Sequence, residues 1–415
     1  MYIAENFKQL PRTQKIALLF LTIYSIAIFC YGIRGALKSS SDQQTFYTTS
    51  KLLLQKVDPS QMTTDYFKRT NTDVGFGDID RHGGRSMYPP STHVLLIPFY
   101  AFLLSSVAAK YCWLFCNIMC LGIIYYVLCV RYLSAVSSFY KYILLCVLIG
   151  AASTKTNLDL GQTSLFSCAA FLITLLLKDR HKWSSGIAFA LAVAKPSLMV
   201  LFAIYLLCRK EYRIVITACA IHLALTAGIS LWMGISPVTL LNNYFAKVSL
   251  LIFYKGTIAF YHQTHGISFK SLLFALNMSQ SVINIATLIL YAAAVAYIVS
   301  IKNCEEHYVL GTAALLTLLV DFHQHYDLTV LLFMFPLFAA CAQNKRNPAW
   351  PFLYFLFLLY IPNVSRINFF GYSTASFFLS HKDYLLWWQM FYTGMYVLLL
   401  GVYRRAFNSD MRTAM

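Results

Sequence analysis

The sequence predicts an all-α polytopic membrane protein, and three observations lead to this fold class. The chain has 415 residues, of which 59% are hydrophobic and only 12% are charged, and its mean hydropathy is +0.60. A soluble domain does not carry so much apolar surface with so few charges. The apolar residues also fall into repeated runs near the length that crosses a bilayer as a helix. Basic connections separate many of these runs, which is typical of a multi-pass integral membrane protein.

The net charge of +17 has two possible explanations. A basic chain can bind nucleic acid, but in a chain of membrane spans Lys and Arg gather on the inside and contact lipid phosphates. We therefore expect membrane lipid as a partner and no nucleic acid. The eleven cysteines are scattered and form no CxxC pair, so we expect them to pack in the core rather than bind metal or react.

Twelve spans are predicted, with both termini inside. The first, 16–33, follows a basic stretch and is long enough to be an uncleaved anchor rather than a signal peptide. The others follow when the basic connections are placed on one side of the membrane. They are 111–130, 142–153, 160–177, two short spans within 184–208, 214–234, 282–301, 308–320, 328–342, 349–362 and 385–403.

Two apolar runs do not fit as simple spans. If the run 91–109, which contains Pro98, crossed the membrane, Arg131 would be forced outside. We favour a helix that lies flat on the outer surface, and the spanning alternative stays open. The run 184–208 has Lys195-Pro196 at its centre, where a straight span would bury a lysine at a cost of about 3 kcal/mol. Two short helices broken there would instead place the lysine at an outward-facing cavity.

We interpret the chain as one integral-membrane domain, with a first module over 1–234 and C-terminal helices over 235–415. The first outer loop, 34–110, opens with a predicted helix over 42–56. The predicted topology places the unusual polar groups of the chain on the same outer side. These groups are Asp42, the Tyr88-Pro89-Pro90 turn, Asp159-Leu160-Gly161-Gln162, Lys195, His262, His265 and the cluster from His323 to Asp327.

Asp42 is the candidate catalytic base. It falls in the first turn of the predicted helix, where the helix dipole favours an ionised carboxylate. Transfer of a sugar from a polyprenyl phosphate to a hydroxyl needs a base and cationic groups for the leaving phosphate. Lys195, His325 and Arg366 are the candidates for binding that phosphate. The structural alternatives are that Asp42 only caps a helix and that Lys195 extends to the membrane surface.

Other polar positions are candidates for contact with the sugar or the acceptor. Gln162 could contact the sugar, or only fill a helix start. His323 and His325 could contact phosphate or acceptor, be satisfied interface histidines, or bind a metal together with Asp321 and Asp327. We favour substrate contact, and we expect no metal and no cofactor.

Five short motifs follow one another along most of the chain. They are Asp42 with Tyr47 and the leucine-rich Lys51 to Lys56, then Met87-Tyr88-Pro89-Pro90, Leu160-Gly161-Gln162-Thr163-Ser164, Gly186 through Lys195-Pro196, and His323-Gln324-His325-Tyr326. Their order and spacing resemble glycosyltransferase family 87 over about residues 35–345. The segment 261–268 departs from the family, because it contains His-Gln-Thr-His-Gly where an Asn-Gln-Ser-type element is expected.

The resemblance implies a bundle of the GT-C type and an inverting transferase with Asp42 as base and no required metal. It implies a polyprenyl-phosphate sugar as donor, with mannose as the expected hexose and another hexose left open, and a glycolipid or glycan as acceptor. The expected location is a bacterial inner membrane, with the active site facing outward, and an ER membrane stays open. The candidate substrate-binding residues are Tyr47, Tyr88, Gln162, His262, His265, His323 and Tyr326.

Two other functions stay open on the sequence. A transporter or flippase for a lipid-linked or small solute should have internal repeats and polar groups at mid-membrane, and the sequence has no convincing repeat. A ligase that moves a whole glycan from a lipid diphosphate would favour more outer arginines than Arg81, Arg85 and Arg366.

Overall fold

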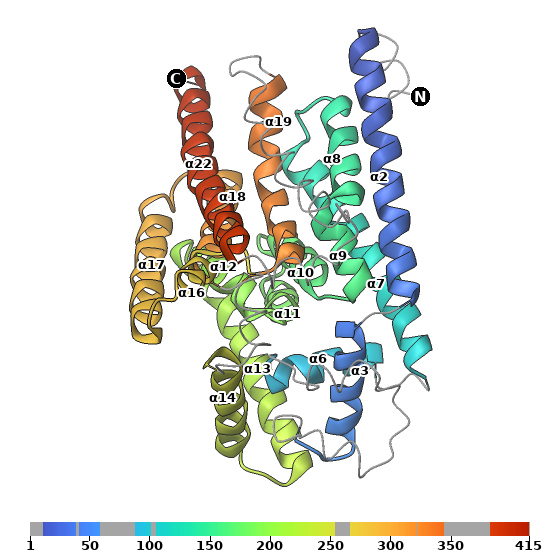
Figure 1. The fold of residues 1–415 in the computed structure, drawn as a ribbon, viewed down its shortest axis with the longest axis vertical. Coiled ribbons are helices and arrows are strands. Elements are labelled where there is room, and N and C mark those ends of the chain that lie inside the picture. Colours follow the sequence, from blue (N-terminus) through green and yellow to red (C-terminus); the bar gives the residue numbers. More distant parts are fainter. Residues whose placement is uncertain are drawn as a thin grey trace.

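The regular structure of the chain is helical in all the residues that the computed structural model describes, so the predicted all-α class is confirmed for them (Figure 1). The described residues are 11–38, 41–58, 88–100, 105–253, 266–321, 323–343 and 382–414. The helices are α2 (Arg12–Lys38), α3 (Ser41–Leu54), α6 (Pro90–Tyr100), α7 (Ser106–Val127), the π-helix η1 (Leu128–Tyr132), α8 (Ser138–Gly150), α9 (Ala152–Leu160), α10 (Ser164–Leu177), α11 (Lys182–Ala192), α12 (Pro196–Cys208), α13 (Tyr212–Met233), α14 (Pro237–Phe253), α16 (Phe269–Ala275), α17 (Gln280–Ser300), α18 (Glu306–Val320), the 3-10 helix η2 (His325–Met334), α19 (Phe335–Gln343) and α22 (Lys382–Ala414).

Five segments among the described residues are long and apolar enough to cross a membrane. They are α2, α7 with η1, α13, α17, and η2 with α19. A sixth is present if α8 and α9, which are bent by 40° at their junction, form one span. The helices α10, α12 and α18 are apolar but shorter. The protein is therefore an integral membrane protein, but the predicted count of twelve spans is not established, and the span predicted over 349–362 lies outside the described residues.

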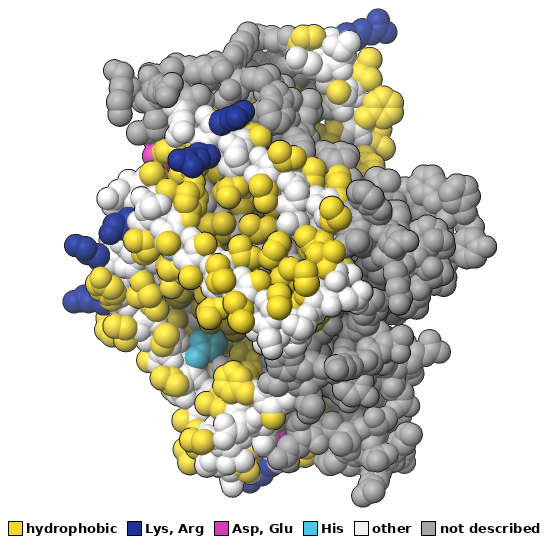
Figure 2. Space-filling view, turned by 60° about the vertical axis from the view of Figure 1, so that its left-hand side comes forward, with side chains coloured by type: hydrophobic (Ala, Val, Ile, Leu, Met, Phe, Trp, Pro, Cys, Tyr) yellow, Lys and Arg dark blue, Asp and Glu magenta, His cyan; other side chains and the backbone are white. Residues whose placement is uncertain are grey.

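The surface of the bundle has the composition of a face in contact with lipid. Large apolar side chains such as Phe20, Leu231 and Leu288 are exposed. Figure 2 shows hydrophobic side chains covering a broad area, with Lys and Arg side chains mainly at its margins. Contiguous exposed apolar patches of this kind are rare in soluble monomers and mark an interaction surface, here with the hydrocarbon of the bilayer.

The predicted break at Lys195-Pro196 is confirmed. Helix α11 ends at Ala192, α12 begins at Pro196, and Lys195 lies between them with φ −117° and ψ 84°. Proline is well suited to the first position of a helix, because the N–H that it lacks would have no partner inside the helix. The break lets a buried lysine point into the bundle rather than at lipid.

Helix α6, which follows the Pro-Pro turn, has 11 residues and is too short to cross a bilayer. Figure 1 shows it lying across the direction of α2. Thr92 Oγ1 donates to the carbonyl oxygen of Ala194 at 3.2 Å, and Ser91 Oγ lies 2.9 Å from Nδ1 of His222 in α13. The predicted flat helix over 91–109 therefore corresponds only to α6, because residues 106–109 of that run already belong to α7. The orientation of α6 to the membrane stays a prediction, and Thr92 attaches it directly to the residues before Lys195.

The short helix α9 was not predicted from the sequence. Its residues Ser153, Thr154, Lys155, Thr156 and Asn157 are polar and yet buried. It packs closely against α2, where a Cβ at Gly32 would lie 3.2 Å from Cα of Lys155. The helix ends at Gly161, whose φ of +71° is in the left-handed region that favours glycine.

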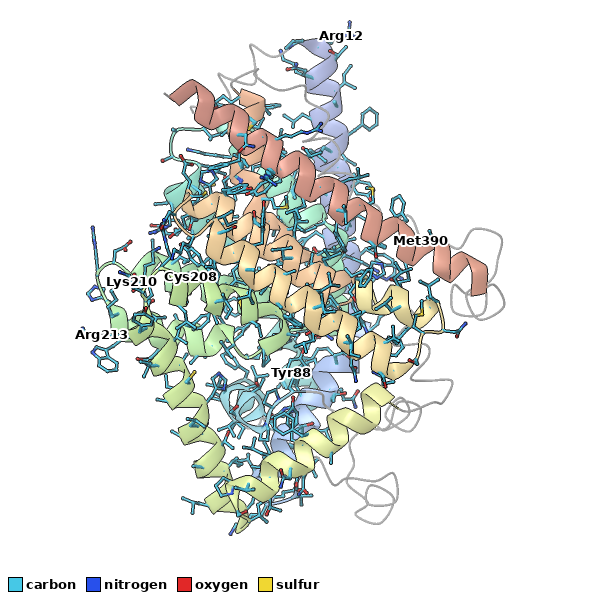
Figure 3. The ribbon with its side chains drawn as sticks, turned by 90° about the vertical axis from the view of Figure 1, so that its left-hand side faces the viewer. Arg12, Tyr88, Cys208, Lys210, Arg213 and Met390 are labelled. Carbon is cyan, nitrogen blue, oxygen red and sulfur yellow. The ribbon has the colours of Figure 1, made fainter. Side chains whose placement is uncertain are left out.

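The chain direction places two polar regions at opposite ends of the bundle. Helices α10 and α12 both begin beside Lys195, and the residues that follow their ends are Lys178 and Arg209. Figure 3 shows Lys210 and Arg213 together at the connection of α12 and α13, away from Tyr88. The candidate polar groups and these basic connections thus lie at different ends, which is the arrangement that the predicted topology requires. We call the two ends the Asp42 end and the basic end.

Candidate active site

Lys195 is held in a buried ion pair. Its Nζ lies 2.5 Å from Oδ1 of Asp327 and donates to Ser164 Oγ at 2.9 Å. The two charged side chains are only 7% and 3% exposed. The ring centroid of Tyr326 lies 4.1 Å from the same Nζ, within range of a cation–π contact. The ammonium group thus has partners from the start of α10 and from η2.

The second oxygen of the Asp327 carboxylate faces His323 and the backbone before η2. Oδ2 lies 3.0 Å from Nδ1 of His323 and accepts from the N–H of Gln324 at 3.4 Å. Oδ1 also accepts from Ser164 Oγ at 2.6 Å. A buried carboxylate with this many partners is stable as an anion, so Asp327 is poorly placed to take a proton from a substrate.

Asp42 has a more open environment. It lies in the first turn of α3, is half-buried, and its Oδ2 accepts a hydrogen bond from Nε2 of Gln162. Oε1 of Gln162 accepts from the hydroxyl of Tyr88 at 3.2 Å, and that hydroxyl lies 3.0 Å from Thr163 Oγ1. Burial raises the pKa of the Tyr88 hydroxyl, so it stays protonated and can donate. The amide of Gln162 is therefore fixed from both sides, and it orients the carboxylate.

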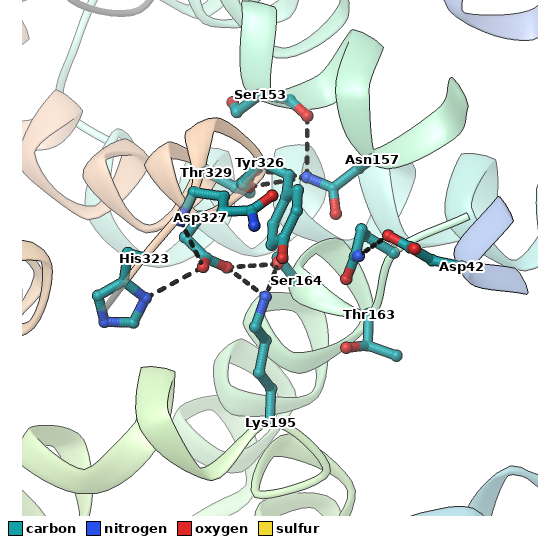
Figure 4. Close-up of polar contacts among 12 residues, drawn as sticks. Asp42, Ser153, Asn157, Thr163, Ser164, Lys195, His323, Tyr326, Asp327 and Thr329 are labelled. Atoms are coloured by element: carbon teal, nitrogen blue, oxygen red, sulfur yellow. Dashed lines mark hydrogen bonds and ion pairs between the residues drawn. The ribbon is translucent and has the colours of Figure 1, made fainter. Parts of the chain in front are cut away.

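Three consecutive residues connect the two halves of the site, and we call them the bridging segment (162–164). Gln162 contacts Asp42 and Tyr88, Thr163 contacts Tyr88, and Ser164 contacts Lys195 and Asp327. Figure 4 shows Asp42 on one side and His323 on the other, with Lys195 and Tyr326 between them. The bridging segment follows directly on the left-handed Gly161, which turns the chain from α9 into α10.

Helix α9 supports the site from the side of η2. Asn157 Nδ2 donates to the carbonyl oxygen of Tyr326 at 2.8 Å, to Thr329 Oγ1 at 3.1 Å and to the carbonyl oxygen of Ser153 at 2.9 Å (Figure 4). The backbone of Tyr326 is thereby held next to α9, and its ring is held against Lys195. Asn157 of α9 thus helps to position the site.

A family model described as glycosyltransferase family 87 matches residues 87–332. The match covers more than half of the chain, and it contains the bridging segment, Lys195 and Asp327. This chain belongs to glycosyltransferase family 87. The network around Lys195 is therefore the candidate active site of an integral membrane glycosyltransferase, and the resemblance seen in the short motifs is confirmed. Comparison of the chain with curated proteins and with solved structures gave no match.

Most of the site residues predicted for this family 87 chain lie in the network. They are Asp42, Tyr88, Gln162, Lys195, His323 and Tyr326. Two other predicted residues point elsewhere. The ring of His325 makes an edge contact with Tyr392 of α22, with centroids 5.6 Å apart, and Tyr47 is buried in an apolar cluster with Phe46 and Trp113. Arg366, His262 and His265 lie outside the described residues. Their predicted roles, and that of His325 in phosphate binding, stay predictions.

Asp327, Ser164 and Thr163 were not predicted as site residues, and Asp327 was considered only as a metal ligand. A signal for Asp327 was present in the sequence of this family 87 chain. A lysine in the middle of an apolar run needs a counter-ion, and Asp327 is one of the acids on the same predicted side of the membrane. No local pattern, however, indicates which of those acids pairs with Lys195.

Proposed function

We propose that this glycosyltransferase moves a hexose, with mannose as the expected sugar, from a polyprenyl-phosphate donor to a hydroxyl group of a glycolipid or glycan. The reaction would take place on the outward face of a bacterial inner membrane and would invert the anomeric carbon. The observation that carries the proposal is the bridging segment, which links a half-open carboxylate, Asp42, to a buried cation, Lys195.

The place of Lys195 supports a donor carried by lipid. The lysine sits at a break between two apolar helices of a membrane bundle, so a donor whose tail stays in the hydrocarbon could bring its phosphate to this depth. A sugar on a polyprenyl phosphate is a donor of this kind. The phosphodiester carries one negative charge and gains a second as it leaves. A fixed ammonium group stabilises that developing charge.

The environment of Asp42 supports its role as base. Its half-exposed carboxylate, oriented by Gln162, can take the proton of the acceptor hydroxyl. The hydroxyl oxygen then forms a bond to the anomeric carbon, and the bond between that carbon and the phosphate oxygen breaks. The electron pair of the broken bond stays on the polyprenyl phosphate, and a single displacement of this kind inverts the configuration.

The outward orientation is supported by the distribution of charge. Lys178, Arg209, Lys210 and Arg213 lie at the basic end, and basic connections between spans are found preferentially inside. The Asp42 end would then face outward. The donor and acceptor would meet there, away from the soluble nucleotide sugars of the cell interior.

The base assignment is tested with Asp42→Asn in the purified, reconstituted full chain and a synthetic polyprenyl-phosphate mannose. Because the amide cannot take a proton, we expect transfer to fall about 10²–10⁴-fold, while the thermal unfolding midpoint and donor binding change little. The matched control is Asp159→Asn. This other outer-end carboxylate is paired with Lys155 at 3.5 Å and has no described contact with the bridging segment, so its variant should retain activity.

Two results would contradict the proposal. If the turnover rate of Asp42→Asn is within a few-fold of that of the unmodified enzyme, Asp42 is not the catalytic base. Transfer from a nucleotide sugar, with none from the polyprenyl-phosphate sugar, would remove the proposed donor while leaving the family assignment intact.

A further inference from the structure

We propose that Asp327 is a positioning residue for the donor. Its carboxylate keeps Lys195 charged and in place to receive the donor phosphate, and it orients His323 in the same site. The inference rests on the proposed function, because it assumes that the group bound by Lys195 is the phosphate of a lipid-linked sugar.

Burial of both charges indicates a role beyond stability. The side chains of Lys195 and Asp327 are almost completely removed from solvent. Removing two charges from water is costly, and apolar residues of similar size often stabilise a fold as well or better. In this structure the pair lies in the candidate active site, next to the bridging segment. A charged pair retained at such a place is more useful for binding or chemistry than for holding helices together.

The contacts around Lys195 leave it able to bind an anion. An ammonium group has three N–H donors. One is used by Asp327 Oδ1 and a second by Ser164 Oγ, and the Tyr326 ring lies against the group. The carboxylate and the serine thus fix the direction of the remaining donor. Asp327 thereby sets where a phosphate oxygen can be received.

The same carboxylate orients His323. Its Oδ2 lies 3.0 Å from Nδ1 of His323, and the ring is fully buried. Within the described part of the chain, Nε2 of His323 has no hydrogen-bond partner. A proton on Nδ1, held by Asp327, leaves Nε2 as an acceptor. One carboxylate therefore sets both the place of a cation and the tautomer of a neighbouring imidazole.

Burial disfavours the charged form of Lys195, and Asp327 of η2 opposes this effect more than any other neighbour does. The more distant Asp42 of α3 and the thiol of Cys168 in α10 act in the same direction as Asp327. Tyr326 contributes its ring face, and Ser164 a neutral hydroxyl. Without Asp327, a buried amine in this surrounding would lose its proton more easily. A neutral amine no longer pairs with phosphate.

The test compares Asp327→Asn and Asp327→Glu with the unmodified enzyme in nanodiscs, with polyprenyl-phosphate mannose as donor. For each we would measure the KM for donor, kcat and the dependence of kcat/KM on pH. The asparagine variant keeps the shape and loses the charge. We expect kcat/KM for donor to fall about tenfold or more, with the alkaline limb of the profile moved to lower pH. The glutamate variant keeps the charge but displaces it. It should raise the KM and leave the alkaline limb in place.

The matched control is Asp321→Asn. Asp321, which lies between α18 and η2, is also an acid near a lysine, with Lys270 Nζ at 3.9 Å. It accepts a hydrogen bond from the Tyr291 hydroxyl. Its variant should keep the donor KM and the pH profile of the unmodified enzyme. If Asp327 has only a structural role, its variants should have a lower thermal midpoint but an unchanged donor KM and an unchanged pH profile. This outcome in both Asp327 variants would overturn the proposal. If only the glutamate variant folds, an unchanged donor KM in that variant is enough to overturn it.

Failure of the proposed function would be seen separately. If the unmodified enzyme transfers nothing from polyprenyl-phosphate mannose, the donor assignment is wrong. The effect of Asp327 on the charge of Lys195 is then tested without substrate. Mass spectrometry would measure how the acetylation of Lys195 by acetic anhydride depends on pH. Asp327→Asn should make Lys195 reactive at lower pH than in the unmodified protein, and identical profiles would overturn the inference.

Discussion

At the scale of single residues, Gly161 combines two constraints. Its φ of +71° is unfavourable for a residue with a side chain, and a Cβ there would lie 2.4 Å from Cβ of Gln43 in α3. Its carbonyl oxygen also accepts from Trp113 Nε1 at 2.8 Å. The residue therefore fixes both the turn into the bridging segment and the distance to the helix that carries Asp42.

We predict that Gly161→Ala lowers both stability and transfer. The left-handed backbone alone costs about 1–2 kcal/mol for alanine, and the contact with Gln43 would push α3 away from the bridging segment. Gly234→Ala is the matched control, because Gly234 has a φ of +72° but nothing lies within 4 Å of the place that a Cβ would take there. Thermal unfolding in detergent and transfer assays should show a larger loss for Gly161→Ala. Equal losses would mean that the Gln43 contact relaxes freely.

Residues that are unusual within their own segment could be predicted as site residues. Lys195 interrupts an apolar run and precedes a proline, and Asp42 begins a helix at the end of a span. Asp327 and Ser164 could not be assigned in this way, because Asp327 contacts Ser164 and Lys195 across more than a hundred positions of sequence. Such pairings depend on how α10, α12 and η2 pack, which local sequence does not show.

At the scale of elements, α11 and α13 pack closely through a small residue. A Cβ at Gly186 in α11 would lie 2.5 Å from Cβ of Thr217 in α13. Small residues let membrane helices approach closely, where packing contacts replace the hydrophobic effect. This contact matters for the site because α11 leads directly to the break at Lys195, and α13 holds α6 through His222.

We expect Gly186→Ala to separate these helices and lower the free energy of unfolding by about 1–3 kcal/mol, the usual range for overpacking. Gly228→Ala in α13 is the control, because nothing lies within 4 Å of a Cβ at that position. The measurement is the thermal midpoint of both variants in the same detergent. A midpoint for Gly186→Ala equal to that of the control would show that the two helices can separate without penalty.

Long apolar elements were predictable, and short polar ones were not. Helices α2, α13 and α17 contain the predicted spans 16–33, 214–234 and 282–301 almost completely, because a continuous apolar run is a strong signal. Helix α9 gave no such signal, since its polar residues resemble a loop. It is helical because it is enclosed by other elements, where an unpaired backbone is costly.

At the scale of the whole molecule, the basic end is closed by a network around Glu306. Its carboxylate accepts from Arg131 Nε at 2.9 Å, the Tyr132 hydroxyl at 2.5 Å, the Tyr205 hydroxyl at 3.0 Å and Lys178 Nζ. These partners come from η1, from the C-cap of α10 and from α12, while Glu306 begins α18. One largely buried acid thus fastens four elements at the end opposite the candidate active site.

Glu306→Gln should therefore destabilise the protein by about 3 kcal/mol, because the mostly buried Lys178 loses its counter-ion and Arg131 keeps only Asp179, at 3.5 Å. The adjacent Glu305→Gln is the control, since the Glu305 side chain is 55% exposed and only approaches His307. We expect a lower thermal midpoint for Glu306→Gln and near-normal kcat/KM in the folded fraction of both. If Glu306→Gln changes the donor KM but not the thermal midpoint, the basic end instead takes part in the reaction.

The bridging segment sets a covalent limit on how this enzyme can vary. Because Gln162 contacts the acid and Ser164, two residues later, contacts the cation, the chain itself fixes the distance between these two groups. One residue added within 162–164 would rotate the following helix by about 100° and misalign both contacts at once. New acceptors are therefore easier to accommodate through changes in the surrounding loops than through any change in the bridging segment.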